Sequence, residues 1–251
     1  MPYTATTLQP VQYVTVTDKL GTVQGYLWFN DEERAAGWVL RAVRGEEAAG
    51  RGAFWAAKLD DAEARGLSPS TALAEFFKAD TEIDNRLVEV SLTTAGSLRE
   101  VQQLADCADA EDRLLLGQLS RDAAAWQELA EAAAELTVED RDVKWAGSGE
   151  QPGGTYRIGY PDYSPRLRRL MSAISRVGAV TPAYYWMDHR MQEVPADGQL
   201  PHADAVRAAT AIARGERFSD GTIAQAAREG LLDAVVASLL AWYRQSSAAA
   251  V

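Results

Sequence analysis

The spacing of hydrophobic residues changes along the chain, and this change limits the folds that the sequence can adopt. In residues 12–29 apolar and polar side chains alternate, as in strands with one buried face, and Asp18 to Gly21 supply a turn between them. Residues 86–93 alternate again. From about residue 97 onward, apolar residues recur at helical spacing. The pattern predicts an α+β protein, with a small antiparallel sheet and helices in the N-terminal half and a mostly helical C-terminal domain with a short β-hairpin.

Helices are expected beside the strands of the N-terminal half. Asn30 can cap a helix whose first turn is acidic, which the positive end of the helix dipole favours, and this helix would include Trp38 and Val43. Residues 53–65 predict a second helix, and the Ser-Pro pair at 68–69 begins a third. The N-terminal half is therefore expected to be a β-hairpin, joined by a third strand, with helices around it.

A domain boundary is predicted between residues 1–120 and residues 121–251. Just after it, Asp122 can cap a helix over 123–136, in which Trp126 belongs to a core-facing stripe. Further helices are expected along the rest of the chain, at 165–177, 203–214 and 222–243.

A β-hairpin is expected within this second domain. Two short strands at 142–145 and 155–160 flank the glycine-rich segment 147–154. A phosphate-binding loop is the alternative interpretation of these glycines. It is disfavoured because the glycines lead into a strand, not a helix, and no Lys accompanies them.

Charge and composition exclude several classes of protein. The formal net charge is −11, so phosphate backbones and anionic lipids should repel the chain, unless a local basic patch overrides the repulsion. Cys107 is the single cysteine and there are two histidines, so we expect no disulfide, no thiolate or His-rich metal site and no cofactor. A divalent site made of carboxylates alone stays open, without a motif to support it.

The sequence also indicates where the protein resides. No apolar run approaches the roughly 18 residues that cross a bilayer, and no secretion signal is recognisable. We therefore expect an acidic cytoplasmic protein without membrane contact. The abundance of Ala, Arg, Gly and Asp over Lys, Asn and Ile is typical of a GC-rich bacterial genome.

Four motifs follow one another in the C-terminal half. They are Leu136 to Asp140 ahead of Trp145, Tyr-Pro-x-Tyr-Ser at Tyr160 to Ser164, Thr181 to Trp186, and Asp204 to Ile223, which contains Arg-Gly-Glu-Arg-Phe-x-Asp-Gly-Thr-Ile. With these motifs, the stretch from about Trp126 to Trp242 resembles a family of domains of unknown function in GC-rich bacteria. The Tyr184-Tyr185 pair departs from the family pattern, in which Phe-Asp precedes the tryptophan. The resemblance implies a domain without a reaction, and it leaves residues 1–120 unassigned.

Residues 214–221 join two predicted helices and are called the elbow below. Structural roles explain most of them, and we favour that interpretation over catalysis. The expected roles are Gly215 as the C-cap of one helix, Ser219 or Asp220 as the N-cap of the next, and Phe218 as a plug in the core.

Glu216 and Arg217 in the elbow are not explained by capping. If they face a pocket together with Trp186, the planar guanidinium and the carboxylate could clamp a polar ligand. With nearby motif residues they form a predicted site for a ligand or a protein partner. Its members are Tyr160, Tyr163, Trp186, Glu216, Arg217 and Asp220.

Residues 184–189 bring aromatic rings, a carboxylate and an imidazole together in sequence. Asp188 and His189, together with Glu216, are the candidate acid and base groups of an enzyme. On an extended segment Trp186 and Asp188 would share a face, while Asp188 and His189 would point apart. An isolated surface histidine is the more common explanation of His189.

Arg166, Arg169 and Arg176 lie on one side of the predicted helix at 165–177. They are candidates for binding an anion or an acidic segment, and a solvated face explains them equally well. With the aromatic residues they could bind single-stranded nucleic acid, which the overall charge disfavours.

These patterns favour a non-catalytic binding protein whose C-terminal domain presents an aromatic, Arg- and Glu-lined site to a protein partner or a small ligand. A hydrolase that uses Asp188, His189 and Glu216 is the alternative, and a nucleic-acid-binding regulator is the second alternative. The preferred hypothesis requires the elbow and the aromatic residues at 184–186 to converge in space.

Overall fold

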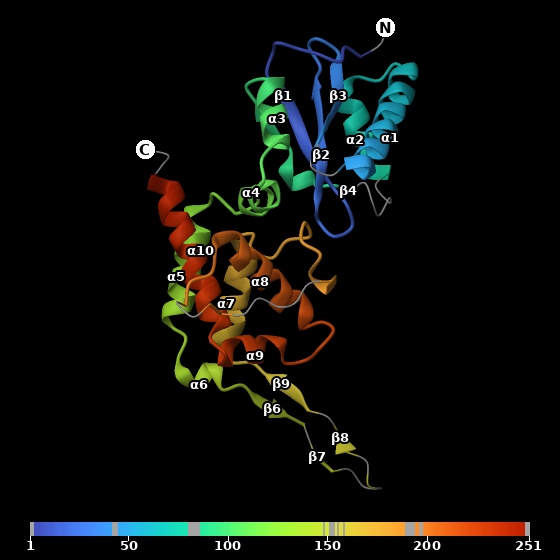
Figure 1. The fold of residues 1–251 in the computed structure, drawn as a ribbon. Helices are drawn as coiled ribbons and strands as arrows, with labels where there is room; N and C mark the ends of the chain where they lie inside the picture. The colour runs from blue at the N-terminus through green and yellow to red at the C-terminus, as the bar shows by residue number, and fades with distance from the viewer. Residues whose placement is uncertain are drawn as a thin grey trace. The chain divides into compact units, whose positions relative to one another are not determined.

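The computed structural model describes residues 3–41, 45–79, 86–147, 149–150, 154, 156–157, 159–188, 194–195 and 198–248. The chain forms two compact units, Met1–Gly117 and Gln118–Val251. The first contains a small antiparallel sheet with helices, and the second is mostly helical with a β-hairpin (Figure 1). The predicted α+β class is therefore confirmed.

The sheet of the N-terminal unit is built around the predicted hairpin. Its strands are β1 (Val11–Thr17), β2 (Val23–Asn30), β3 (Ala35–Leu40), β4 (Arg86–Leu87) and β5 (Thr93–Ala95). They are antiparallel in the order β3-β2-β1-β4, and β5 also pairs with β1. The turn between β1 and β2 is fixed by Asp18, whose Oδ1 accepts hydrogen bonds from the amides of Leu20 and Thr22 at 2.8 and 2.9 Å.

Helices lie on both faces of this sheet (Figure 1). They are α1 (Gly45–Ala64), α2 (Pro69–Ala79) and α3 (Leu98–Ala105), and a further helix, α4 (Ala110–Gly117), follows α3. On one face, Val14 and Leu27 pack in a buried cluster with Trp55 of α1 and Phe76 of α2. The apolar members of the alternating pattern therefore supply the main core of this unit.

The predicted helix from Asn30 through Val43 is wrong, because residues 35–40 form strand β3. Asn30 does accept a hydrogen bond from the amide of Glu33, at 2.8 Å, but this caps only a tight turn. The turn ends at Arg34 with a φ of 48°, and the strand follows. Pairing of the whole strand with β2 outweighs the helix-start signal, and Ala36, Trp38 and Leu40 take the two-residue period of a strand.

The predicted strand at 86–93 is also interrupted. A 3-10 turn, η2 (Glu89–Ser91), separates β4 from β5. Within it, Ser91 Oγ accepts a hydrogen bond from the amide of Thr15 at 2.8 Å, so the turn stays attached to β1.

The C-terminal unit combines helices with one long hairpin. The helices are α5 (Ala123–Ala134), α6 (Val138–Arg141), α7 (Pro165–Arg176), α8 (His202–Gly215), α9 (Thr222–Arg228) and α10 (Leu231–Ala248), with a 3-10 turn η3 (Trp186–Asp188). In the hairpin, β6 (Lys144–Ala146) pairs with β9 (Tyr160–Asp162), and β7 (Gly149–Glu150) pairs with β8 (Tyr156–Arg157). The hairpin extends away from the helices of its unit (Figure 1).

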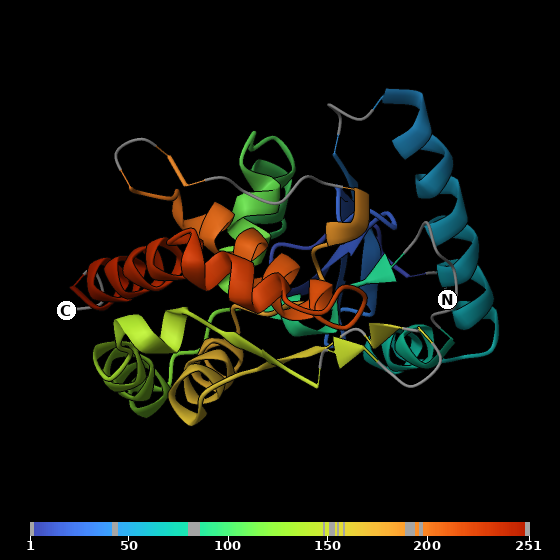
Figure 2. The ribbon, with the colours of Figure 1, turned by 90° about the horizontal axis from the view of Figure 1, so that it is seen from below.

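Four of these helices enclose the core of the C-terminal unit: α5 lies beside α7, and α8 beside α10 (Figure 2). Asp122 caps α5 as predicted, because its Oδ1 accepts a hydrogen bond from the amide of Ala124 at 3.0 Å. Trp126 is 1% exposed and stacks on Tyr243 at a centroid distance of 4.7 Å. None of the helices in the described part of the chain has the length and apolar character that a membrane span requires.

Candidate functional site

The elbow brings the end of α8 close to the start of α9. Two of its glycines, Gly215 and Gly221, lie very close to neighbouring side chains. A Cβ atom at Gly215 would lie 3.2 Å from Thr222 Cγ2. Gly221 has a φ of 92°, and a Cβ atom there would lie 2.7 Å from the indole ring of Trp145. The hairpin, through Trp145, therefore packs directly on the elbow backbone.

Glu216 is the centre of hydrogen bonding in the elbow. Its carboxylate accepts hydrogen bonds from the amides of Gly221 and Ile223, at 3.1 and 2.9 Å, and from the hydroxyl of Tyr163 at 2.6 Å. These contacts form the Glu216 network. It ties the first turn of α9 and the segment after β9 to the same carboxylate.

The Glu216 network replaces the cap that the sequence predicted. The N-cap position of α9 is Gly221, and no side chain at that position caps the helix. The N-cap is neither Ser219 nor Asp220, so the expectation that one of them caps α9 is wrong. The carboxylate of Glu216, five residues before Gly221, caps the helix instead. Its negative charge is favourable at the N-terminal end of a helix.

Tyr163 is held as a neutral donor in this network. Burial of the phenol raises its pKa, and the hydrogen bond to Glu216 raises it further. The hydroxyl proton therefore stays on Tyr163 across the physiological range, and the bond to Glu216 persists.

A second polar group, centred on Asp140, joins α6 to the start of α7. Asp140 accepts hydrogen bonds from the amide and hydroxyl of Thr137, at 2.9 and 3.0 Å, in a reciprocal capping box of α6. The hydroxyl of Ser164, the N-cap of α7, is the largest cause that lowers the pKa of Asp140 to about 2, and the bond from the Thr137 amide adds to it. Asp140 therefore joins α6 to the start of α7 as an ionised group.

Large apolar side chains gather at the surface around the elbow. The rings of Trp186 and Phe218 lie 5.7 Å apart at an angle of 50°. Phe218 is 71% exposed, Met187 52% and Trp145 43%. Trp145, Trp186, Met187 and Phe218 are called the aromatic surface below. The prediction of Phe218 as a core plug is wrong, because its ring contacts Trp186 at the surface and not the core.

The other predicted members of the binding site do not all lie at this surface. Arg217 and Asp220 are exposed in the elbow. Tyr160 is 55% exposed, but it pairs with Ala146 whereas Trp145 pairs with Pro161, so Tyr160 and Trp145 lie on opposite faces of the hairpin. The elbow and the rings therefore converge at Trp186 and Phe218, with Tyr160 on the far face of the hairpin.

The structure describes only some of the candidate acid and base groups. The side chain of Asp188 and all of His189 lie outside the described residues. Trp186 to Asp188 form the 3-10 turn η3, so the expectation that Trp186 and Asp188 share a face of an extended segment is wrong. Glu216, the third candidate, already accepts three hydrogen bonds.

The arginines of α7 are paired with carboxylates of their own unit. Arg166 lies 3.5 Å from Asp140, Arg169 lies 2.5 Å from Glu135, and Arg176 pairs with Glu128. The pair of Arg169 with Glu135 is exposed and contributes little stability, but the three pairs together reduce the free positive charge of this face. The arginines on the basic side of α7 are therefore paired with acidic residues at α5 and α6.

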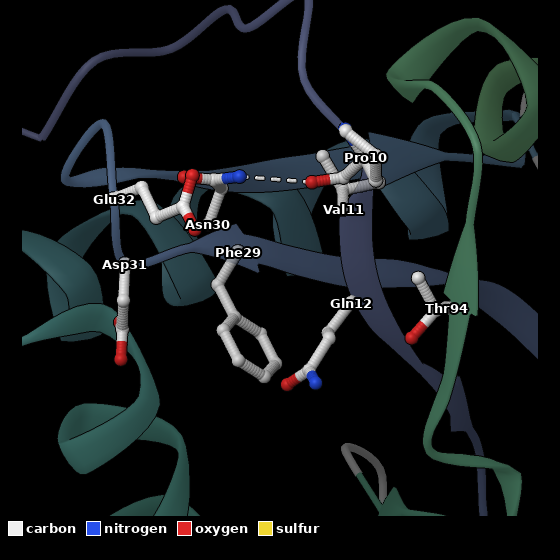
Figure 3. A pocket seen from close by; sticks show the side chains of 8 residues that line it. All are labelled: Pro10, Val11, Gln12, Phe29, Asn30, Asp31, Glu32 and Thr94. Atoms are coloured by element: carbon white, nitrogen blue, oxygen red, sulfur yellow. Dashed lines mark hydrogen bonds between the residues drawn. The ribbon is translucent and has the colours of Figure 1, made fainter.

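The N-terminal unit contains a separate cavity of about 320 Å³. It is lined by Pro10, Val11, Gln12, Phe29, Asn30, Asp31, Glu32 and Thr94 (Figure 3). Across one wall, Asn30 Nδ2 donates a hydrogen bond to the carbonyl of Pro10 at 2.8 Å. Asp31 accepts one from the amide of Ser70 at 2.9 Å, so this carboxylate already has a structural role. No sequence motif marked this cavity, because its walls come from separate segments.

Replacing Glu216 tests the structural account of the elbow. We expect Glu216→Ala to lower the free energy of unfolding by about 2–3 kcal/mol, because three donors lose their acceptor, and Tyr163→Phe by about 1 kcal/mol. The double variant should cost less than the sum of the two changes. Urea unfolding followed by tryptophan fluorescence measures these differences.

Asp220→Ala is the matched control for Glu216→Ala, since Asp220 is an exposed acid of the same elbow. It should change stability by less than about 0.5 kcal/mol. An equal loss in both variants would show that Asp220 caps α9 after all.

The lowered pKa of Asp140 predicts a stability change in acid. Its pKa falls from 3.8 to about 2 on folding, so its contribution is fully present above about pH 4 and disappears as the pH falls towards 2. The stability difference between wild type and Asp140→Asn, measured by urea unfolding, should shrink over this range. A difference that stays constant with pH would contradict the assignment.

Comparison with known proteins concerns the C-terminal unit. Residues 121–245 match a family of unknown function (DUF6508). No curated protein and no solved structure matched the chain. The match confirms the resemblance of this region to a domain of unknown function, and it contains the elbow, the Glu216 network and the aromatic surface.

Proposed function

We propose that the C-terminal unit is a protein-binding module and that the aromatic surface is its contact site. The observation that carries the proposal is the contact of Trp186 with Phe218, whose ring is 71% exposed on an elbow fixed by Glu216. Exposed clusters of large apolar side chains on a folded unit are typical of interaction sites. Tryptophan and other aromatic residues are also the side chains that most often anchor protein interfaces.

The surroundings of the aromatic surface fit this role. Three hydrogen bonds to Glu216 fix the elbow that carries Phe218, so little conformational freedom would be lost on binding. Arg217 and Asp220, both exposed, provide a polar rim of opposite charges next to the rings.

A protein partner is favoured over a small ligand by the exposure of Phe218 and Met187. Small-molecule sites are concave and cover most of their ligand, whereas Phe218 and Met187 are 71% and 52% exposed. Open apolar side chains of this kind are covered more completely by the broad surface of another protein.

The two alternatives receive less support. A hydrolytic role would require Glu216 to exchange the hydrogen bonds of the elbow for contact with a substrate. A nucleic-acid site on α7 would have to compete with the carboxylates that pair with its arginines. On composition we place this binding module in the bacterial cytoplasm.

Removal of the two rings tests the proposed contact site. We expect the variant Trp186→Ala with Phe218→Ala, made in the full chain, to lose proteins that wild type retains from a lysate of the source organism. Because Phe218 is exposed, Phe218→Ala alone should alter the free energy of unfolding by less than about 0.5 kcal/mol. Pull-down with mass spectrometry and urea unfolding provide the two measurements.

Val138→Ala is the control for loss of an exposed apolar side chain, since Val138 is 77% exposed at the start of α6. It should retain the same proteins as wild type. The same retained set for wild type, Val138→Ala and the double variant would refute the aromatic surface as the contact site.

A further inference from the structure

The outer edge of strand β3 is the strongest unassigned feature of the N-terminal unit. In the sheet order β3-β2-β1-β4, β3 pairs with β2 on one side only. On its other side the described part of the chain provides one isolated bridge, between Thr4 and Ala35. An edge strand presents a row of backbone donors and acceptors that can pair with another strand.

Two hydrogen bonds fix which residues of β3 point outward. The amide of Arg41 donates to Gln24 on β2, at 3.1 Å, so this position faces the sheet. The amide of Ala36 donates to Thr4, at 3.1 Å, so Ala36 faces the edge. Because backbone direction alternates along an antiparallel strand, Trp38 and Leu40 also direct their N–H and C=O groups outward.

These outward groups have no partner in the described part of the chain. No described residue forms a hydrogen bond with the outward amide of Trp38 or Leu40. Residues 37–40 are also partly exposed along this edge. The free stretch is therefore Trp38 to Leu40, since Thr4 occupies the neighbouring position at Ala36.

The sequence of β3 lacks the features that usually protect an edge. Natural edges are often blocked by charged side chains, proline or a bulge. Strand β3 reads Ala-Ala-Gly-Trp-Val-Leu, with no charge and no proline, and its register with β2 contains no bulge. The sequence of β3 therefore does not block pairing with another strand.

We propose that β3 pairs with β3 of a second copy of this chain, antiparallel, about a twofold axis at Val39. The free stretch is self-complementary in this arrangement. Trp38 of one copy lies opposite Leu40 of the other, and each pair exchanges two backbone hydrogen bonds. All outward groups of Trp38 and Leu40 are then satisfied in both copies. The second chain has to leave the edge after Leu40, because Thr4 occupies the position beside Ala35 and Ala36.

The arrangement also specifies the contact at the axis. Val39 lies opposite Val39 of the other copy as a pair without direct hydrogen bonds, where Cα atoms are about 4.5 Å apart. This separation lies within the range that a disulfide can bridge, about 4.4–6.8 Å. The inference does not depend on the aromatic surface or on its proposed function.

The first test changes a single outward amide in the full chain. Leu40→Pro removes an N–H that points away from β2, whereas Leu40→Ala shortens the side chain and keeps that N–H. By sedimentation velocity, wild type and Leu40→Ala should have about twice the monomer mass of 27.3 kDa, and Leu40→Pro the monomer mass. A wild type that stays monomeric as concentration rises would overturn the proposal.

The second test uses a crosslink and does not require the proline variant to fold. Cys107, the single cysteine, is replaced by serine, and Val39→Cys is then introduced. On mild oxidation this protein should form a covalent dimer. The control Leu8→Cys in the same background, at a position 97% exposed, should remain monomeric. A wild-type dimer whose Val39→Cys variant does not crosslink would place the dimer contact elsewhere and overturn the pairing.

Discussion

The carboxylate of Glu216 organises the C-terminal unit around the elbow. Three donors from two parts of the chain, Tyr163 after the hairpin and the amides of Gly221 and Ile223 at α9, converge on this one side chain. Without it, the first turn of α9 would lack a side-chain cap and the Tyr163 hydroxyl would lose its acceptor. The position of the aromatic surface depends on this arrangement, because Phe218 lies between Glu216 and Gly221.

Polar and apolar side chains have different roles in this site. In this unit the polar groups Glu216, Tyr163 and Asp140 are hydrogen-bonded within the structure, while Phe218 and Met187 are exposed. Polar groups that are hydrogen-bonded within the unit hold the surface in place, and exposed apolar side chains provide contact area. This distribution fits a binding module better than an acid-base site.

Local patterns were sufficient to predict much of the fold. The alternation at 12–29 predicted the first hairpin, and the cap at Asp122 predicted the start of α5. Strand β3 was missed because the signal of Asn30 and three acidic residues is local, whereas strand pairing with β2 is not. In the site, convergence of the elbow with Trp186 was anticipated, but the burial of Phe218 was misjudged, since hydrophobicity alone does not reveal which ring stays exposed. The role of Glu216 depends on Tyr163, 53 residues away, and no spacing rule indicates such a contact.

Amide hydrogen exchange of the full chain, resolved by NMR, tests the central claim most directly. If Glu216 fixes the elbow, the amides of Gly221 and Ile223 should exchange far more slowly than unstructured amides, although neither is bonded to a backbone carbonyl within a helix. Exchange of both amides at the rate of an unfolded chain, while the amides of α8 stay protected, would show that the elbow is not held by Glu216 and would contradict the account.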